Sequence, residues 1–238
     1  MAHEKSRAYL YGTARRGPSM PYIVALKRRA LLIGTAAAVL APSLPSSAKA
    51  AESARLVVTP GQTEGPFYPV TLPADMDNDL VRVAGHAARA LGRVTHIAGR
   101  VLDKRGAPVR GAMVEIWQCD ANGIYNHPRQ SGLQRRDADF QGYGRTEVAE
   151  DGGYAFRTIR PVAYPGRTPH IHFKVHAPGA GRLTTQMYVA GERQNATDGV
   201  LNGIRSAAAR ESVIVRLEPA ELPEPGALRG VFDIVLDI

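Results

Sequence analysis

The chain has 238 residues, of which 44% are hydrophobic and 22% are charged, so it is long enough and apolar enough to bury a core of its own. The formal net charge of +8 is misleading, because the first fifty positions hold eight of the 30 basic residues and one of the 22 acidic residues. The remaining 188 residues are nearly neutral and contain no basic cluster, which argues against a nucleic-acid-binding surface.

Residues 1–50 have the order of an export signal. Lys27, Arg28 and Arg29 precede an apolar stretch over residues 30–44, and small residues follow up to Ala50. The paired arginines are typical of a twin-arginine signal. We therefore predict cleavage after Ala50 and export to the periplasm or the extracellular space. Met20 remains open as an alternative start.

A membrane anchor is the rival interpretation of the same segment. A span needs about 20 apolar residues, whereas this run has about fifteen and is interrupted by Pro42 and Pro45. We expect no stable membrane span in the mature form. Residues 51–238 are expected to form a single domain. Cys119 is the only cysteine, so no internal disulfide can form, and we expect it to be a buried small hydrophobe.

Short apolar or alternating runs, separated by turn residues, dominate the mature chain. Such runs predict β-strands at residues 94–103, 112–119, 144–149, 154–159, 170–177, 183–190, 213–217 and 231–238. Helix is expected only at residues 75–79 and 198–208. Because no long helix separates the strands, the sequence predicts an all-β fold, an antiparallel β-sandwich with long loops.

Two histidines stand out on one predicted strand. His170 and His172 are two positions apart, so their side chains point to the same side of the sheet while Ile171 and Phe173 face the core. The pair alone fits a metal site and a hydrogen-bonded surface pair equally well. Tyr164 lies just before it on a loop stiffened by prolines. Tyr125 follows a strand and a turn, and by itself fits an ordinary packed aromatic.

Taken together, these motifs resemble the intradiol ring-cleavage dioxygenases, most closely the protocatechuate 3,4-dioxygenase branch. The resemblance covers roughly residues 58–190. It rests on residues 63–69 (TEGPFYP), 115–118 (EIWQ) followed by Tyr125, 139–145 (DFQGYGR), 154–161 (YAFRTIRP) and 164–173 (YPGRTPHIHF), which occur in the family's order. The β-sandwich core of that family agrees with the strand prediction.

The resemblance implies a non-haem iron(III) site with Tyr125, Tyr164, His170 and His172 as ligands. Hard phenolate oxygens favour iron(III), whereas the iron(II) oxygenases use two histidines and a carboxylate. The implied reaction is cleavage of a catechol by O2 between its two hydroxylated carbons, giving a muconate-type dicarboxylate. Tyr164 matches the tyrosinate that the substrate displaces and that takes one of its protons.

Four further residues match the family's substrate-side positions. Arg167 is implied to stabilise negative charge on the reacting ring, and Gln186 to orient a ligand histidine or the substrate. Phe67 and Tyr68 are expected in the wall of a substrate pocket, with ordinary packing as the alternative. The protein partners and oligomeric state are open; the expected small molecules are a protocatechuate-like catechol and O2.

The chain also departs from the family pattern. Five residues separate Tyr164 from His170, fewer than in protocatechuate or catechol enzymes, and Gly166 stands where protocatechuate enzymes carry a bulky aromatic. We therefore expect a more open pocket mouth. About forty residues between Ala50 and the first core strand are too few for the helical dimerisation domain of catechol 1,2-dioxygenases.

Two other functions remain compatible with the composition. A non-catalytic β-sandwich binding module would keep the scaffold without the chemistry. A copper or zinc oxidoreductase would use the histidine pair with a third ligand, for which Cys119, His127 and His176 are available. In that case the two tyrosines would have no role.

Overall fold

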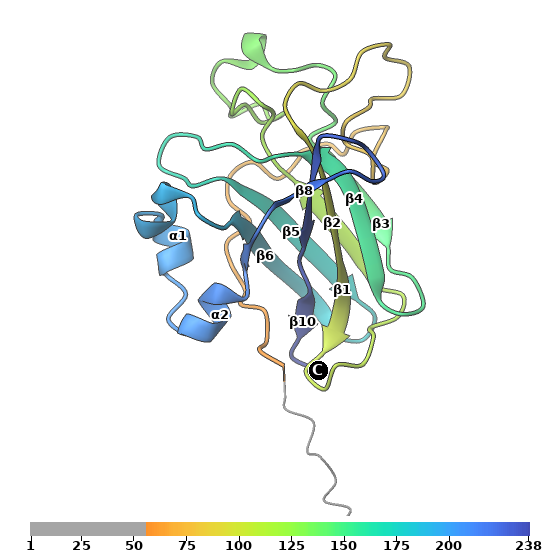
Figure 1. The fold of residues 1–238 in the computed structure, drawn as a ribbon, viewed down its shortest axis with the longest axis vertical. Helices are drawn as coiled ribbons and strands as arrows, with labels where there is room; N and C mark the ends of the chain where they lie inside the picture. The colour runs from red at the N-terminus through yellow and green to blue at the C-terminus, as the bar shows by residue number, and fades with distance from the viewer. Residues whose placement is uncertain (1–55) are drawn as a thin grey trace, which may run out of the picture. The chain divides into compact units, whose positions relative to one another are not determined.

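The computed structural model describes residues 56–238, which form two packed β-sheets with long loops at one end (Figure 1). The predicted export signal at residues 1–50 lies outside the described residues. No helix within residues 56–238 is long and apolar enough to span a bilayer.

The first sheet is built around β1 (Val94–Asp103). Along one side β1 pairs antiparallel with β4 (Gly153–Ile159). Along the other it pairs in parallel first with β9 (Ala227–Val231) and then with β10 (Ile234–Leu236), while β8 (Glu218–Ala220) extends the sheet beyond β9. Phe232 lies against β1 between the two pairings, and its N–H donates to the Ala98 carbonyl at 2.8 Å. A Cβ at Gly99 would lie 1.9 Å from the Phe232 carbonyl oxygen, so this close approach requires glycine.

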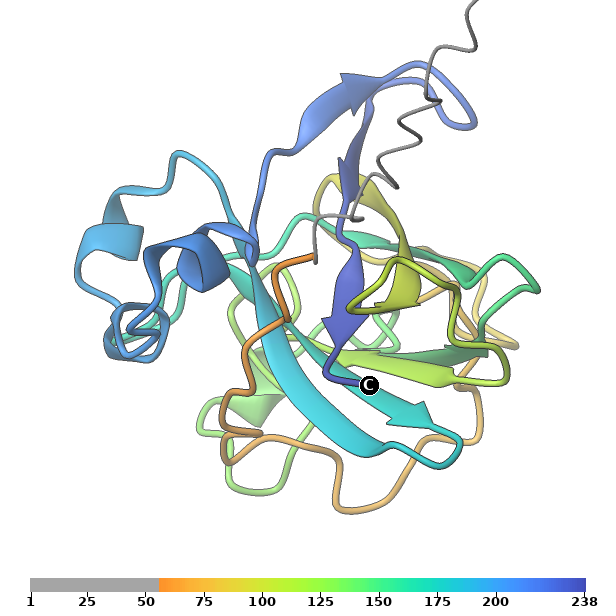
Figure 2. The ribbon, with the colours of Figure 1, turned by 90° about the horizontal axis from the view of Figure 1, so that it is seen from below.

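The second sheet carries the predicted histidine pair. Its order is β3 (Tyr143–Glu147), β2 (Met113–Trp117), β5 (His170–Ala177), β6 (Gly181–Val189) and β7 (Ile214–Val215). All pairs are antiparallel except β6 with β7. Figure 2 views the two layers from below, with β5 and β6 in cyan.

The core lies between the sheets and is made of β-branched and aromatic side chains. Ile171, Phe173 and Val175 of β5 alternate inward and meet Ile97 and Phe156 of the first sheet, and all five are almost completely buried. The opposite face of β5 carries His170, His172 and Lys174, which are also buried because loops cover that face. The strand therefore presents polar side chains to an enclosed space outside the core.

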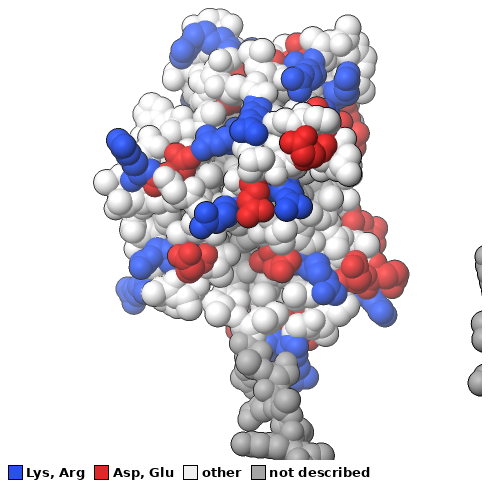
Figure 3. All heavy atoms as spheres, viewed as in Figure 1, with Lys and Arg blue, Asp and Glu red and all other residues white. Residues whose placement is uncertain are grey.

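Residues 56–238 contain four short helical segments. They are the 3-10 turns η1 (Leu133–Arg135) and η2 (Arg193–Ala196) and the helices α1 (Gly199–Asn202) and α2 (Ala207–Glu211). Both α-helices lie on the β6 side of the sheet (Figure 1). Basic and acidic side chains are interspersed on the face drawn in Figure 3.

The β-sandwich is confirmed, and among the named strands of residues 56–238 the parallel pairings are those of β7, β9 and β10. The expected helix at 75–79 is wrong. There the Asp77 carboxylate accepts the Asp79 N–H at 2.8 Å, and the Asp79 carboxylate pairs with Arg157 at 2.9 Å. Aspartates that bond to nearby backbone in this way favour turns over helix. The expected helix at 198–208 is two helices, and the expected strand at 231–238 is β10 alone, preceded by β9.

Candidate metal centre

The two histidines lie side by side on the outer face of β5. His170 and His172 are 1% and 2% exposed, and their Nε2 atoms are 3.2 Å apart. The Nδ1 of His170 is 2.6 Å from the carbonyl oxygen of Thr168, to which it donates its proton. That hydrogen bond leaves the Nε2 lone pair of His170 free and turned toward His172.

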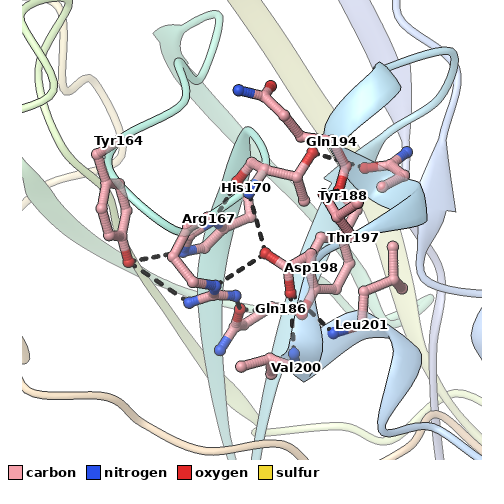
Figure 4. A network of polar contacts seen from close by, with 12 residues as sticks. Tyr164, Arg167, His170, Gln186, Tyr188, Gln194, Thr197, Asp198, Val200 and Leu201 are labelled. Atoms are coloured by element: carbon pink, nitrogen blue, oxygen red, sulfur yellow. Dashed lines mark hydrogen bonds and ion pairs between the residues drawn. The ribbon is translucent and has the colours of Figure 1, made fainter.

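Tyr164 approaches this pair from the loop that precedes β5. Its hydroxyl oxygen is 3.4 Å from Nε2 of His170 (Figure 4). The loop makes a tight turn over residues 164–167, where the Arg167 N–H bonds to the Tyr164 carbonyl and Gly166 adopts a φ of +80°. Glycine takes this left-handed conformation without strain, so the turn can aim the phenol at the histidines.

Tyr125 reaches the same space from the other side. The carboxylate of Asp120 accepts the N–H groups of Asn122 and Ile124, which fixes the turn after β2. The Tyr125 ring lies 5.6 Å from that of Tyr164 and 6.1 Å from that of His172, centroid to centroid. Its hydroxyl is buried and finds no hydrogen-bond partner among the described residues.

The electrostatics of the four groups suit a bound cation. Burial and the Arg167 charge lower the pKa of His170 to about 4, and burial and His170 hold the pKa of His172 well below its usual range. Both imidazoles are therefore neutral and able to donate a lone pair. Burial raises the pKa of Tyr125 well above its ordinary value and also raises that of Tyr164. Phenolates at these positions require a compensating positive charge.

The spacing of the donor atoms also fits a metal. Two nitrogens bound to one first-row ion at about 2.1 Å, at an angle of about 100°, lie about 3.2 Å apart, which is the separation of the two Nε2 atoms. Without a metal, the Nε2 proton of one ring would have to be donated to the other, and Nδ1 of His172 has no partner among the described residues. A buried phenol without a partner is likewise costly unless something binds it. The donor set of two imidazoles and two phenols thus fits a hard, trivalent ion such as iron(III).

Arg167 is held beside Tyr164 by a buried network (Figure 4). Its Nε donates to the Asp198 carboxylate at 2.9 Å, its Nη2 to the side-chain oxygen of Gln186 at 2.5 Å, and its Nη1 to the Tyr164 hydroxyl at 3.4 Å. Gln186 sits across from His172 in the β5–β6 register and is fully buried. Arg167 and Gln186 therefore lie at the candidate centre.

The two expected pocket residues have different surroundings. Phe67 stacks on Tyr125, with ring centroids 4.8 Å apart and planes at 20°. Tyr68 lies edge-on to Trp117, and its hydroxyl donates to Glu115 at 2.8 Å. Phe67 thus contacts a proposed ligand, whereas Tyr68 makes packing and hydrogen-bond contacts one layer away. A substrate-binding role for either stays a prediction.

The loop around Gly166 borders a cavity of about 460 Å³. A Cβ placed on Gly166 would meet no atom within 4 Å. The cavity adjoins Tyr164 and Arg167 and is lined by Ala163, Tyr164, Pro165, Gly166, Arg167, Thr168, Gln194, Thr197 and Asp198. Space at this position agrees with the more open pocket expected from the short loop.

The residues considered for a copper or zinc site do not join the histidine pair. His176 binds Glu115 at 2.7 Å, and Nδ1 of His127 accepts the Arg129 N–H. Cys119 is buried and points its thiol toward the Val162 carbonyl. Within residues 56–238, no three side chains of the His, Cys, Asp and Glu types gather as a metal-binding group. Tyrosines supply the other donors at this centre.

Three residues near the candidate centre were not singled out from the sequence. Trp117 stacks on His172, with centroids 4.7 Å apart and planes at 8°. Asp198 forms an ion pair with Arg167. Lys174 lies two positions beyond His172, on the same face of β5. The alternation of β5 could have indicated Lys174, but nothing local to Asp198 indicates its partner 31 residues away.

Comparisons with known proteins point to one family of enzymes. The family model described as Dioxygenase matches residues 63–238. The chain is 38% identical over 179 residues to the protocatechuate 3,4-dioxygenase beta chain of Burkholderia cepacia, covering 72% of this chain and 76% of that one. It is 32% identical to the hydroxyquinol 1,2-dioxygenase of Nocardioides simplex, covering 72% of this chain and 62% of that one.

A solved structure is similar along nearly its whole length. The dioxygenase domain of a dioxygenase and carbohydrate-binding protein fusion from Streptomyces sp. SirexAA-E superposes with a TM-score of 0.60 at 31% identity, covering 76% of this chain and 99% of that domain. The catechol 1,2-dioxygenase of Acinetobacter sp. ADP1 superposes with a TM-score of 0.59 at 26% identity, and the match covers 62% of its chain.

Proposed function

The chain belongs to the intradiol ring-cleaving dioxygenases, a family of non-haem iron oxidoreductases, and from this premise we propose that it uses iron(III) and O2 to open a protocatechuate-like catechol. The bond broken is the one between the two hydroxylated carbons. Each of these carbons gains one oxygen atom of O2, and the product is a muconate-type dicarboxylate.

One observation carries the proposal: two neutral imidazoles and two phenol hydroxyls converge in a buried space, where phenolates would need a compensating cation. The Nε2 atoms lie 3.2 Å apart, Tyr164 is 3.4 Å from one of them, and the Tyr125 hydroxyl lacks any other partner within residues 56–238. His170, His172, Tyr125 and Tyr164 would hold the iron. When bound, the ferric ion supplies Lewis acidity toward a catechol and the electron transfer that lets it react with O2.

The surrounding residues have separate roles in this proposal. Tyr164, as the phenolate that would bind the iron, accepts one catechol proton at its phenolic oxygen and becomes a neutral phenol; Arg167, 3.4 Å away, stabilises the negative charge there before the transfer. Gln186 holds the guanidinium of Arg167 in place through its side-chain oxygen. Phe67 packs on Tyr125 and excludes water from that side.

The preference for a protocatechuate-like substrate is supported by the 38% identity to a protocatechuate 3,4-dioxygenase beta chain. Hydroxyquinol and catechol dioxygenases are also relatives, at 31–34% identity. Steady-state comparison of protocatechuate, catechol and hydroxyquinol under O2 tests this preference. A kcat/KM highest for protocatechuate supports it, and a higher value for either other diol contradicts it.

We also propose that the protein is exported from the cytoplasm. The basic, apolar and small-residue order of residues 1–50 supports action outside the cytoplasm, in the periplasm or beyond. Cell fractionation of the full chain, with Arg28 and Arg29 replaced by lysine in a control, tests the route. Retention of the control in the cytoplasm is expected, and equal export of both forms would refute the twin-arginine assignment.

A further inference from the structure

A segment N-terminal to the first strand crosses the candidate metal centre. We call residues 60–72 the strap; it runs along the outer face of the β2–β5–β6 sheet and is drawn in orange in Figure 1. A Cβ on Gly65 would lie 3.6 Å from Cε1 of His172, and the Phe67 ring stacks on Tyr125. The strap thus contacts two of the proposed ligands, His172 through Gly65 and Tyr125 through Phe67.

One attachment of the strap is to β6. The Gln62 N–H donates to the Thr184 carbonyl at 2.7 Å, and the Gln62 side chain accepts the Gln186 N–H at 3.0 Å. The Gln186 side chain donates to the Thr63 carbonyl at 3.0 Å. These bonds fix the beginning of the strap, before Gly65 and Phe67 reach the ligands.

The other attachment is an ionic cluster around Lys174, in which the Lys174 side chain is buried and the Glu64 side chain is 44% exposed. The Lys174 ammonium is 2.5 Å from the Glu64 carboxylate and 3.3 Å from the centroid of the Tyr68 ring. Its side chain is only 8% exposed. Glu64 and Tyr68 belong to the strap and flank Gly65 and Phe67. Lys174 of β5 therefore binds the strap both before and after the residues that touch the ligands.

Glu115 of β2 strengthens this grip. Its carboxylate accepts the Tyr68 hydroxyl at 2.8 Å and also contacts His176 at 2.7 Å. Burial and the Glu115 carboxylate raise the pKa of Tyr68 to about 12, so its hydroxyl stays protonated and remains a donor. Buried charges persist in folded proteins when they are paired and hydrogen-bonded, as Lys174 and Glu115 are here.

We propose that Lys174 is a positioning residue that fastens the strap over the metal centre, holding Gly65 against His172 and Phe67 against Tyr125. The fastening of the strap follows from the contacts of Lys174 alone, whereas its effect on catalysis rests on the proposed function. A fastened strap keeps water from the ligands and shapes one wall of the catechol pocket. Loosening it weakens substrate binding and metal retention more than it slows the reaction of bound substrate.

The test compares Lys174→Met, which keeps the apolar stem without the charge, with the conservative Lys174→Arg. Lys104→Met is the matched control, because Lys104 forms an ion pair with Asp237 near the C-terminus. Hydrogen exchange on metal-free protein reports the strap directly. We expect about tenfold faster exchange in peptides covering the strap of Lys174→Met, the scale of a desolvated cation–π contact, with β1 and β4 unchanged.

The loaded enzyme gives the second readout. For Lys174→Met we expect KM for the catechol to rise about tenfold, kcat to stay within about threefold, and a chelator to remove iron about tenfold faster. Lys174→Arg restores most of each effect, and Lys104→Met shows none. If Lys174→Met does not fold, Glu64→Gln removes the exposed partner of the same pair, and the same changes are expected with smaller amplitude.

Three outcomes would overturn the inference. They are unchanged exchange in the strap, faster exchange spread through both sheets, and a looser strap that leaves KM and iron loss as in the wild type. A wild-type protein that neither binds iron nor consumes any catechol overturns the proposed function instead. The exchange measurement on metal-free protein still decides whether Lys174 fastens the strap.

Discussion

Asp198 offers a quantitative test of how the candidate centre is built. Its fully buried carboxylate accepts four N–H groups: Arg167 Nε and the Thr168 N–H on one oxygen, and the Val200 and Leu201 N–H groups on the other. Replacing it by alanine removes the N-terminal cap of α1, worth about 1 kcal/mol. It also leaves the guanidinium of Arg167, whose side chain is 16% exposed, without its carboxylate partner.

Breaking a buried ion pair from one side costs about 3–5 kcal/mol, so the loss of the Arg167 partner outweighs the loss of the cap. We expect Asp198→Ala to lower the free energy of unfolding by about 4 kcal/mol. For a domain of this size the melting temperature then falls by about 10 °C. Chemical denaturation and calorimetry measure both. Activity falls further than stability predicts, because Arg167 loses its orientation toward Tyr164.

Asp198→Asn separates charge from capping, since the amide oxygen can still accept the Val200 and Leu201 N–H groups. Burial alone would raise the pKa of Asp198, but the Leu201 and Thr168 N–H donors and Arg167 outweigh burial and lower it. The stabilisation is therefore complete above the usual aspartate pKa and is lost as pH falls through the lowered one. The wild type should lose stability over that acidic range more steeply than Asp198→Asn. Equal pH slopes for the two proteins, or a change below about 1 kcal/mol in Asp198→Ala, would refute this reasoning.

Two other predictions concern glycines. Gly99→Ala places a Cβ 1.9 Å from the Phe232 carbonyl oxygen and should lower stability by about 3 kcal/mol; Gly199→Ala, with open space around its Cβ, is the control and should be neutral by the same denaturation assay. Gly166→Asn, a residue that tolerates the left-handed φ of +80° at this position, narrows the cavity beside Tyr164 and should raise KM for catechols with bulky substituents about fivefold while changing KM for catechol itself by less than about twofold. An equal rise for both substrates would show that the cavity does not receive the substituent.

The sheet architecture could be predicted from the sequence because alternation and turn residues are local signals. The core strands 94–103 and 170–177 match β1 and β5. The strand β8 was missed because Pro219 and its short length give no periodic pattern. The expected helix at 75–79 failed because the Asp77 carboxylate binds nearby backbone and because Asp79 pairs with Arg157, a partner 78 residues away that no local pattern reveals.

The histidines of the candidate site could be predicted from their spacing, whereas the tyrosines could not. The spacing of His170 and His172 places both on one face of a strand, and the structure has them so. Tyr125 and Tyr164 lie on loops, where only resemblance to a family connects them to the histidines. The contacts of Arg167 with Asp198 and of Lys174 with Glu64 join residues 31 and 110 positions apart. Such long-range pairs depend on the completed fold.

The most direct test of the account is the visible spectrum of the purified mature protein after loading with iron(III). Coordination by Tyr125 and Tyr164 predicts a phenolate-to-iron(III) charge-transfer band, about one iron per chain, and a change in the band when protocatechuate is added without O2. Tyr164→Phe should weaken the band, and His170→Ala should abolish iron retention. A colourless wild-type protein that binds no iron, or a band unchanged in Tyr164→Phe, would contradict the proposed centre.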